Sequence, residues 1–359
     1  MSRAPGRVNL IGEHTDYNLG FVLPIALDLV TEAGWHYHAK MQPVLLLSSE
    51  GFEDTATLPI ADLANLKPVH NWTDYVVGVA QQLLKLGFSI MPAILSFKST
   101  VPEGAGLSSS AAIEVSTALA FLNGRPIDPL ELAKLCQRAE REFVGVPSGI
   151  MDQYVSVFGR KEHAVLIDCR SLTHQYVPLP HTDKLEIWAV NSMVKHALGN
   201  SAYKQRVAEC ASAARALNVA SLRDATLEAL QSTPMPDTIL RRARHIVTEN
   251  LRVQAFVPAA HAQDLNRMGE LFYQSHASMR DDYEITCEEI DFLVDTARAQ
   301  EGCYGSRMTG GGFGGCTVNL LRPDAVAQFQ QTIAAAYSER FHTTPQFIRC
   351  VPSDGAVVH

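Results

Sequence analysis

The chain of 359 residues lacks an excess of positive charge: 30 lysines and arginines stand against 38 acidic residues, a formal net charge of −8. This balance argues against a nucleic-acid-binding protein that relies on a basic surface. An anionic ligand remains compatible with it, because backbone N–H groups can hold phosphate without basic side chains. Hydrophobic residues make up 47% of the chain, which is enough for a sizeable core and excludes a disordered protein.

Patterns typical of disulfide frameworks, zinc sites and membrane segments are also missing. The seven cysteines form no Cys-x-x-Cys pair, and the 13 histidines form neither His-x-x-x-His nor His-Glu-x-x-His. The N-terminus has no apolar signal core, and no uncharged apolar run approaches the length of a membrane span. We therefore expect a cytoplasmic protein with reduced thiols and with neither a nucleic acid nor a membrane as partner.

Short β-branched runs alternate irregularly with amphipathic segments, which predicts an α+β fold rather than a doubly wound α/β sheet. Strands are expected at 44–47, 93–97, 164–167, 185–190 and 316–321, and helices at 109–122, 130–143 and 203–217. The proline-containing turn at 178–183 is the expected boundary between two domains, 1–180 and 181–359. The polar stretch 221–237 is expected to be a surface connection.

Three glycine-marked segments are candidate ligand loops. In the first, a short strand expected at 7–11 begins with Arg7 and is followed by Glu13, His14 and Asp16. Four ionisable groups at a strand end can converge on a small polar ligand. The alternative is a solvated loop whose charges pair with one another.

The second segment, 101–113, lies between a strand and an apolar helix. Gly104 and Gly106 allow close approach of the backbone, and the serines after them can cap the helix while its free N–H groups face an anion. The segment is neither a Walker A loop nor a complete Rossmann motif, and the protein-kinase motifs are absent. An ordinary serine-capped buried helix is the alternative.

The third segment has five glycines at 310–315 and runs into an expected strand. It can form an anion-binding nest or a lid, or it can be a tight turn packed under another element.

Two acidic residues lie on expected helices. Glu140 is at the margin of an apolar face, where a carboxylate needs a metal ion or an arginine as partner unless it bends into solvent. Asp152 follows a turn that opens a helix, where it could act as a base facing a cleft or simply stabilise the helix end.

The three segments, in this order, resemble the motifs of the GHMP small-molecule kinase superfamily, and within it those of the galactokinase family. The quoted stretches are GRVNLIGEHTDYNLG at 6–20, PEGAGLSSSAA at 102–112 and SRMTGGGFGGC at 306–316. The resemblance covers most of the chain, because intervening stretches such as 149–153, 167–170 and 280–284 are similar too. It implies a two-domain GHMP kinase fold with the active site in the cleft between the domains.

The implied reaction is transfer of the γ-phosphoryl group of Mg-ATP to the anomeric O1 hydroxyl of D-galactose, giving galactose 1-phosphate and ADP. We expect the protein to be a monomer. Asp152 would accept the O1 proton and Arg7 would stabilise the transferred charge. The resemblance implies that the sugar contacts Glu13, His14, Thr15, Asp16, Gly149 and Tyr203. The nucleotide would contact Trp72, Gly104, Ala105, Gly106, Leu107, Ser108, Ser109 and Ser110. The metal ion, Mg²⁺, would be held by Ser110 and Glu140.

The chain departs from the family pattern in two places. The first motif begins at Arg3, whereas family members usually carry a longer segment before it, so we expect either a truncated chain or a natural short form. Glu103 stands where the family often has a small or apolar residue. Two alternatives stay open: a kinase for N-acetylgalactosamine or another sugar, and a galactose sensor without turnover.

Overall fold

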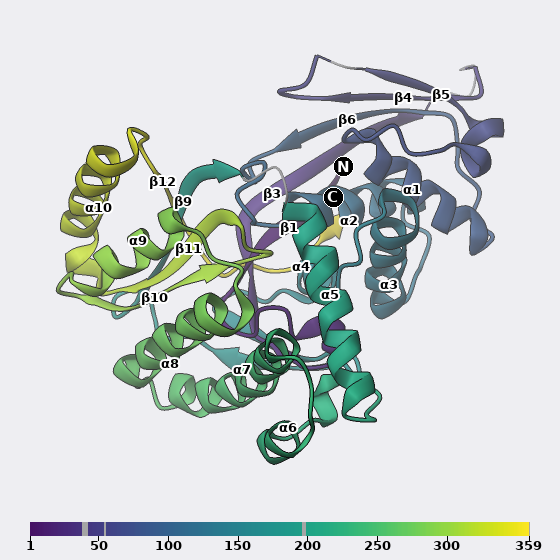
Figure 1. The fold of residues 1–359 in the computed structure, drawn as a ribbon. Coiled ribbons are helices and arrows are strands. Elements are labelled where there is room, and N and C mark those ends of the chain that lie inside the picture. Colours follow the sequence, from purple (N-terminus) through teal and green to yellow (C-terminus); the bar gives the residue numbers. More distant parts are fainter. Residues whose placement is uncertain (38–41, 54, 196–198, 359) are drawn as a thin grey trace.

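The largest sheet of the protein has six strands. The structure, a computed structural model, describes every residue except 38–41, 54, 196–198 and 359 (Figure 1). The strand order is β13-β1-β3-β6-β4-β5, and all pairings are antiparallel except that of β4 with β6. The strands are β1 (Ser2–Asn9), β3 (Pro24–Tyr37), β4 (Val44–Ser49), β5 (Ala56–Pro59), β6 (Ala93–Ser99) and β13 (Val357–Val358).

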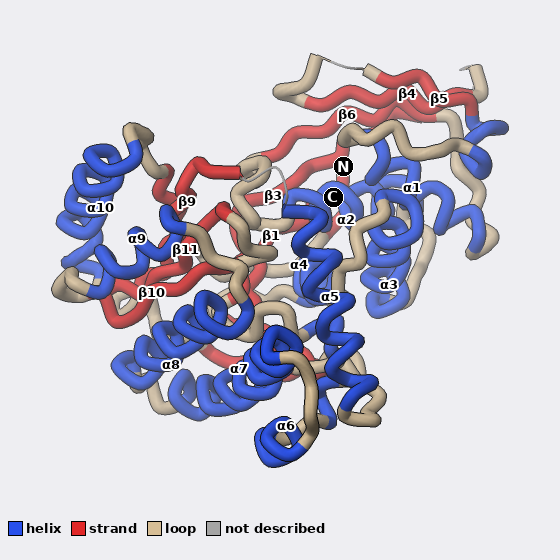
Figure 2. Tube along the Cα trace, in the orientation of Figure 1, coloured by secondary structure: helices blue, strands red, loops and turns tan. Residues whose placement is uncertain are grey.

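One face of this sheet is covered by helices, as Figures 1 and 2 show. Residues on β6 alternate between buried and exposed, so that Ala93, Leu95 and Phe97 face the helices. The helix expected at 109–122 is confirmed as α2, which lies against β1 and β3 and is apolar almost all round. The helices of this layer are α1 (Thr73–Lys85), α2 (Ser109–Leu122), α3 (Pro129–Ala139) and α4 (Met151–Phe158).

The second half of the chain builds a four-stranded antiparallel sheet in the order β10-β11-β9-β12. Its strands are β9 (Glu186–Lys195), β10 (Cys303–Thr309), β11 (Gly314–Leu321) and β12 (Gln346–Arg349). The helices of this half are α5 (Gly199–Ala216), α6 (Leu227–Ser232), α7 (Asp237–His261), α8 (Leu265–Ser278), α9 (Glu288–Arg298) and α10 (Val326–Phe341). A smaller sheet joins β2 (Phe21–Val22), β7 (His163–Asp168) and β8 (Thr173–Pro178).

The two halves share a continuous core. Val8 and Leu10 of the first half pack in one apolar cluster with Phe256, Phe272 and Val318 of the second. The end of the chain also returns to the first sheet, where β13 pairs with Ser2 and Arg3 of β1. The fold class expected from the sequence is thus confirmed, while the boundary at 180/181 stays a prediction.

The first strand is longer at its start than the pattern indicated. The expected strand 7–11 is in fact β1, which begins at Ser2 and ends at Asn9. The Pro5-Gly6 pair does not break it, because the strand accommodates the pair with a bulge between Pro5 and Arg7. Gly6 is required there: a Cβ atom on it would lie 2.6 Å from the Leu107 carbonyl oxygen. The second motif therefore lies directly on the strand of the first.

Two further segments refine the expectations. The helix expected at 130–143 consists of α3 followed by a π-helical turn at Glu140–Val144. The stretch 221–237 is a connection that contains a short 3₁₀ turn and α6, anchored in the core by Leu222 and Leu230. All seven cysteines are unpaired, and no helix in the described part of the chain is long and apolar enough to cross a membrane.

Gly269 lies where the backbone of α8 packs closely against β10 of the second sheet. A Cβ atom on Gly269 would lie 1.8 Å from the Tyr304 carbonyl oxygen of β10. We expect Gly269→Ala to lower the free energy of unfolding by about 1–3 kcal/mol or more, because backbone atoms would have to move. Urea denaturation measures this loss. Gly34→Ala is the control, since its Cβ would meet only the Ser96 side chain within 3.0 Å, and equal effects of the two substitutions would contradict the prediction.

Candidate active site

A pocket of about 910 Å³ lies where the three glycine-marked segments meet. It receives side chains from both halves of the chain, including Tyr203 of α5 and the glycines 310–312 that follow β10. The expected site residues that line it are Arg7, Glu13, His14, Asp16, Trp72, Gly104, Gly106, Ser108, Ser109, Ser110, Glu140, Gly149, Asp152 and Tyr203. Thr15, Ala105 and Leu107 are absent from this lining.

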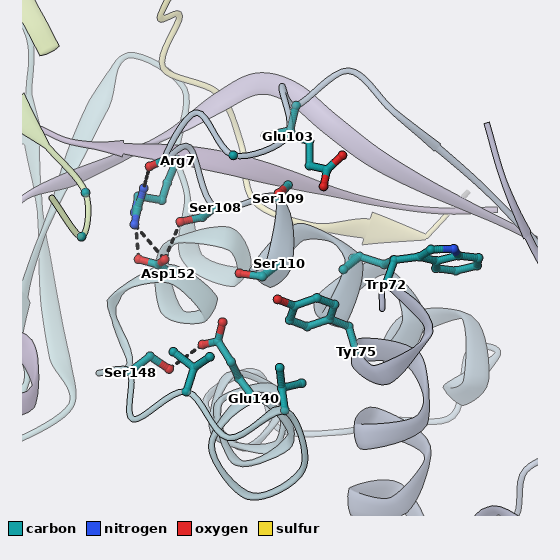
Figure 3. A pocket seen from close by; sticks show the side chains of 18 of the residues that line it. Arg7, Trp72, Tyr75, Glu103, Ser108, Ser109, Ser110, Glu140, Ser148 and Asp152 are labelled. Carbon is teal, nitrogen blue, oxygen red and sulfur yellow. Dashed lines mark hydrogen bonds and ion pairs between the residues drawn. The ribbon is translucent and has the colours of Figure 1, made fainter. Parts of the chain in front are cut away.

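An arginine–aspartate pair lines one side of the pocket (Figure 3). Arg7 Nε and Nη2 each donate to one oxygen of the Asp152 carboxylate at 2.8 Å, a bidentate pair that joins β1 to the start of α4. Arg7 Nη1 also donates to the Gly106 carbonyl oxygen at 2.5 Å. Burial alone would lower the pKa of Arg7, but the carboxylates of Asp152, Glu13 and Asp16 together raise it. The guanidinium therefore keeps its charge while it fixes the orientation of Asp152.

Ser108 differs from the expectation that it caps α2. Its φ is 59° and its side chain makes no capping hydrogen bond; the hydroxyl donates instead to Asp152 Oδ2. The left-handed backbone turns the side chain away from the helix N-terminus and toward the neighbouring carboxylate. Ser109 and Ser110 form the first turn of α2, with both residues at the pocket wall. The helix N-terminus thus faces the pocket with its N–H groups available to an anion.

Glu140 lies deeper in the pocket, on the π-helical turn after α3. Its carboxylate is buried and accepts hydrogen bonds from Ser148 Oγ at 2.5 Å and Gln153 Nε2 at 3.0 Å. Burial raises its pKa, and hydrogen bonds from Ser148, Gln153 and Ser110 offset part of this effect. In the described part of the chain no arginine or lysine forms an ion pair with it, so a cationic partner would have to come from a ligand.

The Ser110 hydroxyl and the Glu140 carboxylate fit a divalent metal ion that shares its remaining ligands with phosphate and water. No group of three or more His, Cys, Asp or Glu side chains in the described ranges could hold a metal by itself. One carboxylate with one hydroxyl matches the small number of protein ligands that Mg²⁺ takes beside substrate phosphates.

Asp16 and Gly149 lie against each other in the pocket lining. A Cβ atom on Gly149 would lie 1.9 Å from Asp16 Oδ2, so glycine is needed to admit the carboxylate. Asp16 accepts a hydrogen bond from the Tyr17 N–H at 2.9 Å and another from the backbone N–H of Met151 at the start of α4. Burial, with the nearby Asp152 charge, raises the pKa of Asp16 to about 7.

The side chains of Glu13 and His14 are partly engaged by the third glycine segment. Glu13 Oε1 accepts from the Gly310 N–H at 3.0 Å. His14 Nε2 lies 3.2 Å from the Gly311 carbonyl oxygen and Nδ1 lies 2.7 Å from the Tyr17 hydroxyl. Burial lowers the pKa of His14 to about 3, so the ring is neutral, and these partners assign the proton to Nε2.

Three expected site residues support the pocket from behind. Thr15, Ala105 and Leu107 are fully buried. The Thr15 hydroxyl contacts the carbonyl oxygens of Gly12 at 2.9 Å and Phe21 at 2.6 Å, which closes the first loop. Their side chains therefore shape the loops, and their expected contacts with sugar and nucleotide stay predictions.

The pocket ends in an aromatic group that the sequence analysis identified only in part. Trp72 packs against Phe52 and Phe97, with ring centroids 6.0 and 5.7 Å away. Its indole Nε1 is buried without a hydrogen-bond partner. Tyr75 lies on the same wall. Phe97 lies on β6 and Phe52 in the segment that follows β4, and their distance from Trp72 in the sequence gave no signal.

A buried acid, Glu114, and a buried amide of α4, Gln153, were also missed. Gln153 donates through Nε2 to Glu114 at 2.9 Å as well as to Glu140, so it bridges two carboxylates. Burial raises the pKa of Glu114 well above its ordinary value, and the Glu140 charge adds to this effect. The position of Glu114 four residues after Ser110 on α2 was the available signal, because it puts both on one helix face.

The chain is similar to known proteins over nearly its whole length. Models described as GHMP kinases N terminal domain, GHMP kinases C terminal and galactokinase galactose-binding signature match residues 74–160, 256–339 and 1–34. A galactokinase from Roseiflexus sp. is 43% identical and one from Bos taurus 44%; each match covers at least 98% of this chain and 91% of the relative. The crystal structure of Lactococcus lactis galactokinase complexed with galactose has a TM-score of 0.94 at 34% identity, covering 99% of this chain and 94% of that one.

Asp16 should make stability depend on pH. Its pKa is raised from 3.8 to about 7, so the folded protein keeps a proton that the unfolded chain releases, and stability falls as pH rises between these values. We expect Asp16→Asn to be more stable than the parent by about 1 kcal/mol or more near pH 8, with the gain shrinking toward about pH 4. Thermal melting across this range measures it. A difference that does not vary with pH would contradict the raised pKa.

Proposed function

Because the chain belongs to the galactokinase family of the GHMP kinases, we propose that its pocket transfers the γ-phosphoryl group of Mg-ATP to the O1 hydroxyl of D-galactose. The products are galactose 1-phosphate and ADP. The observation that carries the assignment of roles is the bidentate Arg7–Asp152 pair, which lies between the sugar motif and the glycine loop. The expected cytoplasmic location and monomeric state stay predictions.

The sugar occupies the end of the pocket formed by the first motif. Its hydroxyls are bound by Glu13, His14, Asp16 and Tyr203, with the Gly149 backbone leaving room for the ring. Acceptor and donor groups that converge in this way reject a sugar that leaves one of them unpaired. Thr15 contributes through the shape of the loop rather than through contact.

Asp152 accepts the proton of the O1 hydroxyl as the O1–phosphorus bond forms and the bond to the β,γ-bridging oxygen breaks. Arg7 and Ser108 hold the carboxylate in place, and the Arg7 charge stabilises the negative charge on the transferred group. A loose transition state needs little help from a base, so positioning is the larger contribution of this pair.

The nucleotide extends from the glycine loop to the aromatic end. The backbone of 104–110 and the N-terminus of α2 bind the phosphates, while Trp72 packs against the base. Ser110 and Glu140 hold Mg²⁺, which when bound neutralises charge on the β- and γ-phosphate oxygens. Ser148 and Gln153 fix the Glu140 carboxylate for this task.

The direct test measures ADP release from Mg-ATP with galactose, N-acetylgalactosamine and glucose in parallel. We expect saturable turnover that depends on galactose. Turnover with N-acetylgalactosamine instead would reassign the substrate. Galactose binding by calorimetry without any turnover would assign a sensor.

Replacement of Asp152 separates chemistry from binding. We expect Asp152→Asn to lower kcat by about a hundredfold or more, because the amide cannot accept the O1 proton and no longer pairs with the Arg7 charge. Calorimetry should still detect galactose binding. Near-normal turnover in this variant would remove the proposed role of Asp152.

Replacement of Glu140 tests the metal site. We expect Glu140→Gln to raise the Mg²⁺ concentration for half-maximal activity by about tenfold or more, because a neutral amide is a poor ligand for a hard cation. Glu142→Gln is the matched control: it lies two residues away, where its carboxylate is bound by Gln82 and Lys85. The same metal dependence in both variants would make Glu140 a structural residue only.

A further inference from the structure

Glu103 is an acidic residue of the phosphate-binding segment that has no role in the site described so far. Its side chain is exposed, lines the pocket, and makes no hydrogen bond or ion pair with any residue of the described chain that the structure records. Figure 3 shows its carboxylate directed into the pocket, between Ser109 and Trp72 and across from Tyr75. From this placement we infer that Glu103 accepts hydrogen bonds from the ribose hydroxyls of the bound nucleotide and makes the enzyme selective for ribonucleotides.

The order of groups along the pocket supports this assignment. Ser109 and Ser110 form the first turn of α2, where the phosphates are proposed to bind, and Trp72 with Phe52 and Phe97 forms the apolar aromatic end. A base on the aromatic end and phosphates at the helix leave the ribose between them. Glu103 lies in this interval, and its charge contributes, after burial and the carboxylates of Glu140, Glu114 and Asp74, to the raised pKa of Tyr75.

The chemistry of a carboxylate narrows the choice of partner. An ionised carboxylate only accepts hydrogen bonds, so it repels phosphate oxygens and requires a donor. The only lysine or arginine in the described lining of the pocket is Arg7, which is already committed to Asp152 and Gly106. Between its phosphates and its base, a nucleotide offers only two hydrogen-bond donors, the 2′- and 3′-hydroxyls of the ribose. Acidic side chains bind ribose hydroxyls in the same way in dinucleotide-binding folds.

The inference rests on the proposed nucleotide site, so its test uses binding as well as turnover. Calorimetry would compare ADP, 2′-deoxyADP and 3′-deoxyADP in the presence of Mg²⁺. We expect the protein to bind ADP about tenfold more tightly than at least one deoxy analogue, and Glu103→Ala to bring this ratio close to one. Glu103→Gln, which keeps one acceptor oxygen, should retain part of the preference. In steady-state assays KM for ATP should rise in Glu103→Ala while KM for galactose stays unchanged.

Glu339→Ala is the matched control, because it removes the same charge from an exposed position on α10 outside the pocket lining. It should leave the ribose preference and both KM values unchanged. An unaltered ratio in Glu103→Ala would overturn the inference, as would tighter ADP binding by that variant, which would mean that Glu103 only repels phosphate. A shift confined to the Mg²⁺ requirement would assign Glu103 to the metal and overturn the ribose contact.

Two outcomes in the parent protein separate this inference from the proposed function. Galactose-dependent turnover with equal binding of ADP and both deoxy analogues overturns the role of Glu103 and leaves the kinase reaction intact. Failure to bind any adenine nucleotide overturns both.

Discussion

A fully buried arginine, Arg307 of β10, holds the sugar motif against the second half of the molecule. Its guanidinium donates to the Leu10 carbonyl oxygen at 2.8 Å and to Glu13 Oε1 at 3.3 Å. On its other side it contacts Ser275 of α8 and lies 3.9 Å from the buried carboxylate of Glu249 on α7. A buried charge must be surrounded by partners to offset the loss of water, so this residue fixes four segments relative to one another. Glu249 adds to the constraint, because it also accepts from the Gly12 N–H at 2.9 Å.

The active pocket contains far more acidic than basic side chains. Asp16, Glu140 and the neighbouring Glu114 all have raised pKa values because burial and mutual repulsion disfavour their charged forms. Such a pocket would repel a nucleotide if side chains alone bound it. This repulsion is overcome if backbone N–H groups of the glycine loop bind the phosphates and a metal ion neutralises the charge of Glu140. The metal requirement that we propose is thus a matter of the charge of the pocket as much as of the reaction.

The sequence predicted elements that depend on neighbouring residues, but not contacts between residues far apart in the chain. The helix at 109–122 and the strands at 93–97 and 316–321 were predicted because periodicity and turn residues are local signals. The proximity of Arg7 to Asp152 came from the family resemblance, since 145 residues separate them. The contact between Arg307 and Glu13 had no local signal, because 294 residues separate them. The hydrogen bond from the Ser108 hydroxyl to Asp152 was not predicted, because it depends on a left-handed backbone that the surrounding loop imposes.

The non-glycine residues that line the pocket include His14 and Ser108, which have positive φ values of 62° and 59°. This conformation is unfavourable for both, costing about 1 kcal/mol or more each, and persists only where the surroundings enforce it. Each side chain is held by a different part of the chain: His14 by Tyr17 and Gly311, Ser108 by Asp152. The backbone strain therefore places these side chains in the pocket before a ligand arrives, so less conformational entropy is lost on binding. Burial of apolar side chains in the core shared by the two halves offsets the free-energy cost of this strain.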